Sequence, residues 1–307
     1  MAFTAADVKK LREMTNVGMM DCKKALVETD GDMDKAVEWL REKGLAKAAK
    51  KAGRISAEGM AYAAVCDKCG VGAMVEVNCE TDFCAGSAPF VAFVKDICTV
   101  VMKDNPADVA ALIECKYPGT ELKVSEVLPE KVMSIGENLQ IRRFARFDKN
   151  TSVSYVHMNG KIGVLVDVET DVVNDAIKEM AKNVAMQAAA LKPLYTNDSE
   201  VDADYIAKEK EILTVAAKNE KPDANDKIIN GMVMGRIKKE LKEICLLDQV
   251  YVKAEDGKQS VAQYVAQVAK ENGAKITVKK FVRFETGEGI EKKEENFAEE
   301  VAKQMGK

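Results

Sequence analysis

Cysteines are the side chains of this sequence that could bind a metal or act as nucleophiles. There are eight of them, and one pair, Cys66-Asp-Lys-Cys69, has the Cys-x-x-Cys spacing that is typical of half a zinc site. Structural zinc needs four ligands, and only Cys79 and Cys84 lie near enough in the sequence to supply the other two. Those two cysteines do not form a second Cys-x-x-Cys. We therefore predict two free thiols in a hairpin turn, with no bound metal and no cofactor.

Acid–base groups offer a second kind of chemistry. Glu80 and Asp82 are close enough to act as paired carboxylates, an arrangement that would also need a concave pocket and a raised pKa. The chain has a single histidine, His157, which excludes His-rich metal sites and most schemes of histidine catalysis. The phosphate-binding pattern Gly-x-x-x-x-Gly-Lys-Ser/Thr and the nucleophile pattern Gly-x-Ser-x-Gly are both missing. The sequence therefore favours a protein that is not an enzyme, with a paired-carboxylate enzyme as the weaker alternative.

The stretch from residue 74 to residue 85 fits a binding role. Apolar and polar residues alternate over residues 75–78, which predicts a half-buried strand. Polar residues then lead to one large apolar ring, Phe83, and Pro89 marks a point where a helix could start. Phe83 either folds beneath that helix, against Phe90, or enters a pocket on another molecule. The pattern leaves both placements open.

Length and charge set the broad class of the protein. At 307 residues the chain is long enough for two or more domains, each with its own core. Charged residues make up 31% of the chain and the formal net charge is only -4, a balance that favours a soluble protein over one that binds nucleic acid non-specifically. No apolar run approaches the roughly 18 residues of a membrane span, and the N-terminus lacks the features of a signal or transit peptide. Cysteines without an export signal indicate reduced thiols, and therefore the cytoplasm.

Residues 1–54 are predicted to form a small helical module. Thr4-Ala-Ala-Asp7 resembles a capping box that opens a first helix, and residues 19–28 form a second. A third helix has apolar residues at helical spacing over residues 33–40, with Gly44 as its C-cap. Three short helices of this kind resemble a ubiquitin-associated-type fold. The basic, alanine-rich residues that follow are predicted to be a solvated linker helix.

An internal repeat organises the rest of the chain. Gly72-Ala-Met-Val-Glu-Val-Asn-Cys-Glu-Thr-Asp82 is echoed by Gly163-Val-Leu-Val-Asp-Val-Glu-Thr-Asp171, and Ile141-Arg-Arg-Phe-Ala-Arg-Phe-Asp148 is echoed by Val278-Lys-Lys-Phe-Val-Arg-Phe-Glu285. The segments alternate between apolar and polar residues and are predicted to be strands. The predicted hairpins pair residues 60–65 with 73–78 and residues 152–157 with 163–168. We predict two related subdomains, residues 55–148 and 149–289, each with a small antiparallel sheet, helices and a closing strand, which is an α+β architecture.

The second subdomain is longer than the first. The leading segments of the repeat, at residues 72 and 163, are 91 positions apart, whereas the closing segments, at residues 141 and 278, are 137 apart, so the second half holds about 46 extra residues. Residues 200–245 fit this excess, because two runs with apolar residues every three or four positions flank a polar turn around Pro222. They are predicted to form a projecting coiled-coil hairpin. It serves either as a partner contact or as a dimerising or stabilising arm.

The last segment of the chain, residues 290–307, is highly charged and follows Gly287-Glu-Gly289, which is predicted to end the last strand. Phe297, Val301 and Met305 fall on one side of a helix. We predict a C-terminal helical module that docks on its own body or on a partner.

Several runs of residues make the sequence similar to one known family over essentially its whole length. They are Leu11-Arg, Thr15, Gly18-Met-Met-Asp-Cys-Lys-Lys-Ala-Leu26, Lys47-Ala-Ala-Lys-Lys-Ala-Gly53, Glu76-Val-Asn-Cys-Glu-Thr-Asp-Phe83, Ile135-Gly-Glu-Asn138, Ile141-Arg-Arg143, Ile162-Gly-Val-Leu165, Arg283-Phe-Glu285 and Gly287-Glu-Gly-Ile-Glu-Lys292. The Gly-Met-Met-Asp-Cys-Lys run and the Asn-Cys-x-Thr-Asp-Phe run are each highly specific, and they occur in order about sixty residues apart. On these residues the chain resembles the bacterial elongation factor Ts family.

The resemblance implies a guanine nucleotide exchange factor that binds the GTPase elongation factor Tu in a nucleotide-free complex and promotes release of GDP before GTP rebinds. In the family a Thr-Asp-Phe turn disturbs the magnesium and nucleotide site of the partner. The matching residues here are Thr81, Asp82 and Phe83, followed by Cys84. The family more often has valine at this last position, a departure that affects local packing more than mechanism.

Further partner contacts of the family map onto other parts of the chain. They correspond to Met19 and Met20 in the N-terminal module, His157 in the second hairpin, and Phe297 in the C-terminal helix. Cys66-Asp-Lys-Cys69 is not part of the family pattern, so no role carries over to it. A homodimer or a dimer of heterodimers stays open. A pure scaffold built from a ubiquitin-associated-like module and a coiled coil is the alternative from another class, and recovery of other proteins in a pull-down would favour it.

Overall fold

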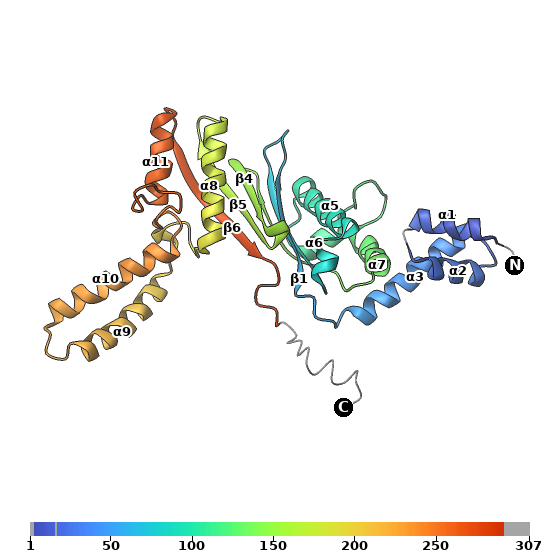
Figure 1. Ribbon diagram of the computed structural model, residues 1–307, viewed down its shortest axis with the longest axis horizontal. Coiled ribbons are helices and arrows are strands. Elements are labelled where there is room, and N and C mark those ends of the chain that lie inside the picture. The colour runs from blue at the N-terminus through green and yellow to red at the C-terminus, as the bar shows by residue number, and fades with distance from the viewer. Residues whose placement is uncertain (1–2, 16, 292–307) are drawn as a thin grey trace.

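The protein is an α+β structure in which two three-stranded antiparallel sheets lie between groups of helices (Figure 1). It is described by a computed structural model that covers residues 3–15 and 17–291. The first sheet has the strand order β1-β2-β3 and the second has the order β4-β5-β6. The N-terminal helices lie at one end of the molecule, and a two-helix arm projects at the other end (Figure 1).

The elements follow the chain in three groups. The N-terminal group is α1 (Ala5–Thr15), α2 (Met19–Glu28) and α3 (Met33–Lys51). The first half of the core contains β1 (Glu58–Val65), β2 (Gly72–Cys79), α4 (Asp82–Ala85), α5 (Ala88–Asp104), α6 (Val109–Glu114), α7 (Val124–Ile135) and β3 (Gln140–Phe147). The second half contains β4 (Thr151–His157), η1 (Met158–Gly160), β5 (Ile162–Thr170), α8 (Asp175–Leu191), η2 (Asp198–Glu200), α9 (Ala203–Glu220), α10 (Asp226–Ile244), α11 (Val261–Glu271) and β6 (Ile276–Glu285).

Strand pairing confirms both predicted hairpins. β1 pairs antiparallel with β2, and β4 pairs antiparallel with β5. The closing strands of the repeat, β3 and β6, pair with the other edges of β2 and β5. Each closing pair has one register shift, between Glu76 and Val77 in the first sheet and between Asp167 and Val168 in the second. These are equivalent positions of the repeat. The two copies therefore share the same β-bulge as well as the same sequence pattern.

Strand β2 is more buried than its sequence predicts. The alternation of residues 75–78 predicts a half-buried strand, and this is wrong, because every residue of β2 is buried. The reason is that β2 is the central strand of its sheet, with α5 packed on one face and the second sheet on the other. Val75 and Val77 belong to the core beneath α5. Met74 belongs to the layer between the sheets.

The two sheets pack face to face through an apolar layer that combines small and large side chains. The layer between them consists of Ala61, Ala63, Met74, Phe147, Leu165 and Phe284. Gly72 and Gly163 lie where the sheets come closest. A Cβ atom on Gly163 would stand 2.9 Å from the backbone oxygen of Ala61, and one on Gly72 would stand 2.7 Å from the Ser152 side chain. Larger residues at these two positions would push the sheets apart.

The N-terminal helices agree with the prediction except at Gly44. The capping box is confirmed, because Thr4 N donates to Asp7 Oδ2 at 2.7 Å and Asp7 N donates to Thr4 Oγ1 at 3.4 Å. The prediction that Gly44 ends the third helix is wrong, since α3 continues to Lys51. Gly44 is buried against α7, where an added Cβ would lie 3.5 Å from the backbone oxygen of Pro129. The third helix and the linker are therefore one helix, and the glycine allows close packing instead of ending the helix.

The predicted insertion contains two long helices. α9 and α10 lie side by side and form the projecting arm in Figure 1. Their own small core consists of Ala217, Ile229, Val233 and Ile237. The role of the arm, and the likeness of the N-terminal module to a ubiquitin-associated fold, stay predictions.

The described chain ends just after β6. This strand stops at Glu285, as the glycines at 287 and 289 predict. The predicted C-terminal helical module covers residues 290–307; all of it from residue 292 on, including Phe297, lies outside the described residues. Across residues 3–15 and 17–291 no helix has the length and apolar character needed to span a lipid bilayer.

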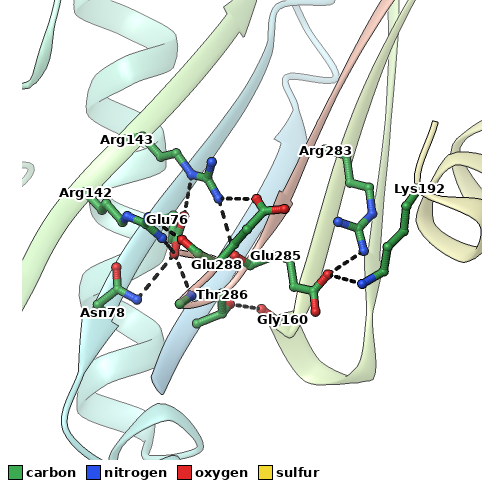
Figure 2. Close-up of polar contacts among 11 residues, drawn as sticks. Glu76, Asn78, Arg142, Arg143, Gly160, Lys192, Arg283, Glu285, Thr286 and Glu288 are labelled. Carbon is green, nitrogen blue, oxygen red and sulfur yellow. Dashed lines mark hydrogen bonds and ion pairs between the residues drawn. The ribbon is translucent and has the colours of Figure 1, made fainter. Parts of the chain in front are cut away.

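A buried carboxylate ties the end of β6 to the first sheet (Figure 2). Glu76 on β2 is fully buried, and its Oε1 accepts hydrogen bonds from Arg142 Nη1 at 2.9 Å and from the backbone N of Gly287 at 2.8 Å. Arg143 Nε donates to the other oxygen of Glu76, and Arg143 Nη2 contacts the Glu288 carboxylate at 3.1 Å. One carboxylate therefore joins β2, β3 and the segment after β6.

We expect Gly287→Ala to destabilise the protein strongly. Gly287 has a φ of +73°, and a Cβ there would stand 2.0 Å from the backbone oxygen of Ala57. The expected loss in the free energy of unfolding exceeds about 3 kcal/mol, since a backbone clash is added to a left-handed conformation that costs ~1–2 kcal/mol by itself. Gly289→Ala is the matched control, because Gly289 has a φ of +75° but its Cβ would meet nothing closer than 3.9 Å. Urea denaturation measures both, and equal losses would contradict the expected clash.

Candidate functional site

Phe83 lies on the surface of the protein. It belongs to the one-turn helix α4 and is 89% exposed. This excludes the placement beneath α5 that the sequence left open. α5 does begin near Pro89 as predicted, but its inner face is filled by its own side chains, among them Phe90 and Phe93. The Phe83 ring is therefore available to another molecule.

The turn that carries Phe83 is fixed by hydrogen bonds of its own. Thr81 is the N-cap of α4, and its Oγ1 accepts a hydrogen bond from Cys84 N at 3.1 Å. The backbone N of Gly86 donates to the carbonyl of Asp82 at 3.1 Å. Cys84 is buried and anchors the inner side of the turn. The exposed ring is thus held on a hydrogen-bonded helical turn.

A second anchor comes from Glu137, which follows α7. Its Oε2 accepts hydrogen bonds from the backbone N of Glu80 at 2.9 Å and of Thr81 at 3.0 Å, and its Oε1 accepts from Thr81 Oγ1 at 2.6 Å. In return, Glu80 Oε1 accepts from the backbone N of Asn138 at 2.7 Å. The two acidic residues clamp the two segments to each other. No site role was predicted for Glu137, although it lies in the matching run Ile135-Gly-Glu-Asn138.

We expect Glu137→Ala to loosen this turn. Loss of the carboxylate leaves two backbone N–H groups and one hydroxyl without an acceptor, which should lower the free energy of unfolding by about 1–3 kcal/mol. Amide hydrogen exchange at Glu80 and Thr81 should also become faster. Glu121→Ala is a control at an exposed carboxylate, with a side chain that is 92% accessible, and should change stability by less than about 0.5 kcal/mol. Unchanged exchange at both amides would contradict the role assigned to Glu137.

The two carboxylates weighed as a catalytic pair have separate structural surroundings. Glu80 is committed to Asn138, as described, and also contacts Arg54 Nη1 at 3.4 Å. Asp82 is exposed at the start of α4 and lines a groove that also contains Met158 from the second half of the core. The geometry does not bring the two acids together as a paired-carboxylate site.

The four cysteines weighed as zinc ligands lie at opposite ends of one hairpin. Cys66 and Cys69 are in the turn between β1 and β2, whereas Cys79 is the last residue of β2. Gly72 and Cys79 are seven residue steps apart along β2, which corresponds to about 23 Å at ~3.3 Å per step. A four-cysteine site is therefore excluded.

The thiols at the two ends have opposite electrostatic surroundings. A hydrogen bond from the Cys69 thiol, together with the backbone N–H groups of Cys69 and Lys68, lowers the pKa of Cys66. Hydrogen bonding to Cys84 and burial raise the pKa of the Cys79 thiol far above its usual range. Cys79 Sγ donates to the carbonyl of Thr81 at 3.2 Å. At the root of the Phe83 turn Cys79 is thus a protonated thiol.

The remaining predicted site residues are spread over the molecule. His157 is exposed at the end of β4, and its Nδ1 lies 2.9 Å from the Tyr155 hydroxyl. Its neighbour Met158 shares the groove with Asp82. Met19 and Met20 are exposed on α2, which Figure 1 places at the far end of the molecule. The structure therefore gathers residues 81–84 in one turn and places His157 and the two methionines of α2 on other parts of the surface, whereas Phe297 lies outside the described residues.

Comparisons with known proteins point to one family. A family model described as elongation factor TS matches residues 80–288. The chain is 51% identical over 307 residues to elongation factor Ts of Clostridium botulinum strain Eklund 17B, with 99% of each chain covered. It is 52% identical over 307 residues to elongation factor Ts of Clostridium perfringens strain 13, with 99% of each covered. It is 53% identical over 304 residues to elongation factor Ts of Clostridioides difficile strain 630, with 98% of each covered.

Proposed function

This chain belongs to the elongation factor Ts family of translation elongation factors, and from that premise we propose that it acts in the cytoplasm as a guanine nucleotide exchange factor for elongation factor Tu. It binds the GDP-loaded GTPase and disturbs the magnesium and nucleotide site of that partner with the turn formed by Thr81, Asp82, Phe83 and Cys84. GDP leaves, and a nucleotide-free complex persists until GTP binds. No covalent bond is made or broken by this chain, which uses no cofactor of its own.

The observation that carries this proposal is an exposed aromatic ring on a fixed turn. Phe83 is 89% exposed, and the turn beneath it is held by the Thr81 cap and by Glu137. A flexible loop would lose conformational entropy when it became ordered against a partner. A turn that is already ordered loses little, so more of the free energy of burying the ring is available to change the shape of the partner.

The free energy from Phe83 falls short of what exchange requires. Burying this ring contributes about 2–3 kcal/mol. An acceleration of GDP release by ~10⁴ needs about 5.5 kcal/mol of difference between binding to the nucleotide-free partner and to the loaded partner. We assign the remainder to contacts made by Met19 and Met20, by His157 and by Phe297. The separation of Met19 and Met20 from His157 along the molecule (Figure 1) suits a partner that is held at several points.

Thermodynamic linkage makes the exchange reversible. If the chain binds the nucleotide-free GTPase more tightly than the loaded one, then GDP or GTP must weaken binding of the chain by the same factor. Rebinding of GTP therefore releases the factor, which can act on the next GDP-loaded partner. Catalytic side chains are not required for this cycle.

The decisive experiment measures release of fluorescent GDP from the cognate elongation factor Tu. The expected result is faster release in the presence of this chain, including at concentrations below that of the GTPase, because the factor is recycled. The spontaneous release rate of the same GTPase preparation is the control. A release rate that stays at the spontaneous value with excess factor would contradict the proposal.

A further inference from the structure

Two thiols and a carboxylate meet at the root of the Phe83 turn. Cys79 Sγ, Cys84 Sγ and one carboxylate oxygen of Glu137 all lie within 4.8 Å of one another. Both cysteines are buried, and Glu137 is half-buried between them and solvent. Across residues 3–15 and 17–291, this is the one group of three or more such ligand atoms that lie this close together. In the proposed exchange activity Cys84 contributes only as a buried residue of the turn, and neither thiol has a chemical role.

The spacing of these atoms suits a tetrahedral metal. Zinc–sulfur bonds of about 2.3 Å and zinc–oxygen bonds of about 2.1 Å place neighbouring ligand atoms roughly 3.6–3.8 Å apart at tetrahedral angles. The three atoms here need to approach one another by only about 1 Å to reach that spacing. Two ligands come from one short segment and the third from Glu137, which is half-buried, and a water molecule from the solvent would be the fourth.

We propose that Cys79, Cys84 and Glu137 form a binding site for a thiophilic divalent cation such as Zn²⁺. On binding, each cysteine transfers its thiol proton to solvent and becomes a thiolate ligand, so one M²⁺ replaces two H⁺ and no electrons are transferred. The two thiolates and the carboxylate supply three negative charges against two positive ones.

Occupation of the site would change the Phe83 turn. Glu137 Oε1 is the acceptor for Thr81 Oγ1 at 2.6 Å, and Cys79 Sγ donates to the Thr81 carbonyl at 3.2 Å. A metal ion withdraws both groups from Thr81, which is the N-cap of the helix that carries Phe83. Cation binding at the proposed site would therefore change the conformation of the Phe83 turn. The site itself can exist whether or not the chain acts as an exchange factor.

The Cys66–Cys69 pair is a competing thiol site that the experiment must remove. It lies at the far end of the β1–β2 hairpin, and Cys69 is exposed. We therefore use the full-length chain with Cys66→Ser and Cys69→Ser as the background. Any further change in that background reports on the other cysteines.

The probe is Cd²⁺ alone, titrated against a competing chelator and followed by thiolate-to-cadmium absorption in the ultraviolet. We expect one Cd²⁺ per chain with the intensity of two thiolates, and Zn²⁺ should displace it. Adding Cys79→Ser should weaken affinity by more than about 100-fold, beyond the 10–100-fold effect of an outer-shell partner. Adding Glu137→Gln, which keeps a hydrogen-bond acceptor at Thr81, should weaken affinity at least tenfold.

A second measurement needs no variant and protects the test against misfolding. In the unaltered chain, Cd²⁺ should slow alkylation of both Cys79 and Cys84, as read by peptide mapping. Because both cysteines are buried, this alkylation is measured in mild urea, where the turn opens often enough for both to react without metal. Absence of the two-thiolate absorption in the double-serine background would overturn the proposal. So would an affinity that Glu137→Gln leaves unchanged, or alkylation of the two cysteines that proceeds equally fast with and without the metal.

Discussion

Phe83→Ala is expected to slow GDP release by about 30- to 150-fold while leaving the fold intact, because the lost burial of ~2–3 kcal/mol falls on the exchange step. The side chain is 89% exposed and belongs to none of the buried clusters, so the free energy of unfolding should change by less than about 0.5 kcal/mol. Overall association with elongation factor Tu should weaken much less than release is slowed. The two measurements are stopped-flow release of fluorescent GDP and equilibrium binding to the nucleotide-free GTPase.

Phe90 provides the matched control for this prediction. It is seven residues further along the chain and fully buried on the inner face of α5. Phe90→Ala should cost about 3–5 kcal/mol of stability, as for other buried phenylalanines. Phe83→Tyr keeps the ring and should retain most of the exchange activity. If Phe83→Ala weakened binding and exchange by the same factor, Phe83 would be an ordinary anchor of the complex and the proposed mechanism would be wrong.

Local patterns predicted the elements that are determined by nearby residues. The capping box at Thr4 and Asp7, the helix start near Pro89 and the two hairpins all depend on contacts within a few residues or on simple alternation. The repeat also placed the closing strands correctly, because each copy carries the same pattern. These features could be read from the sequence since no distant segment changes them.

Features that depend on distant segments were missed or misread. Glu76 alternates with valines as an exposed residue would, but a second sheet, which begins 75 residues later at Thr151, covers that face. Gly44 has the sequence context of a helix end, but α7 packs against it. Glu137 supports the Phe83 turn from 56 residues away in the chain. The placement of Phe83 itself stayed open, because only the filled core beneath α5 decides between the two alternatives.

The residues that carry the resemblance to the family have a clear structural role around Glu76. Three of the matching runs, which contain Glu76, Arg142 with Arg143, and Gly287 with Glu288, meet at this carboxylate (Figure 2). Arg142 is the extra residue of β3 at the register shift, since Arg143 lies opposite Glu76 and Ile141 opposite Val77. The bulge turns the Arg142 guanidinium toward the carboxylate.

Glu76→Ala should therefore destabilise the protein by about 3–5 kcal/mol, the cost of leaving a buried charge pair without one partner. Two guanidinium groups would lose their shared acceptor, and the backbone N of Gly287 would lose its hydrogen bond. The end of β6 would then be held to the first sheet by weaker contacts. Because this end connects the half that carries His157 to the half that carries Phe83, GDP release should slow as well, by more than stability loss alone explains.

Glu288→Ala is the control that distinguishes the contribution of the buried Glu76 carboxylate from that of the exposed ion pair beside it. Glu288 also pairs with Arg143, but its side chain is 52% accessible to solvent, and exposed ion pairs contribute only about 0–1 kcal/mol. Urea unfolding should show a small loss for Glu288→Ala and a large loss for Glu76→Ala with similar dependence on urea concentration. Equal, small losses would mean that the two sheets are held together by the apolar layer between them. In that case Glu76 would hold the end of β6 in place but would not contribute to the free energy of unfolding.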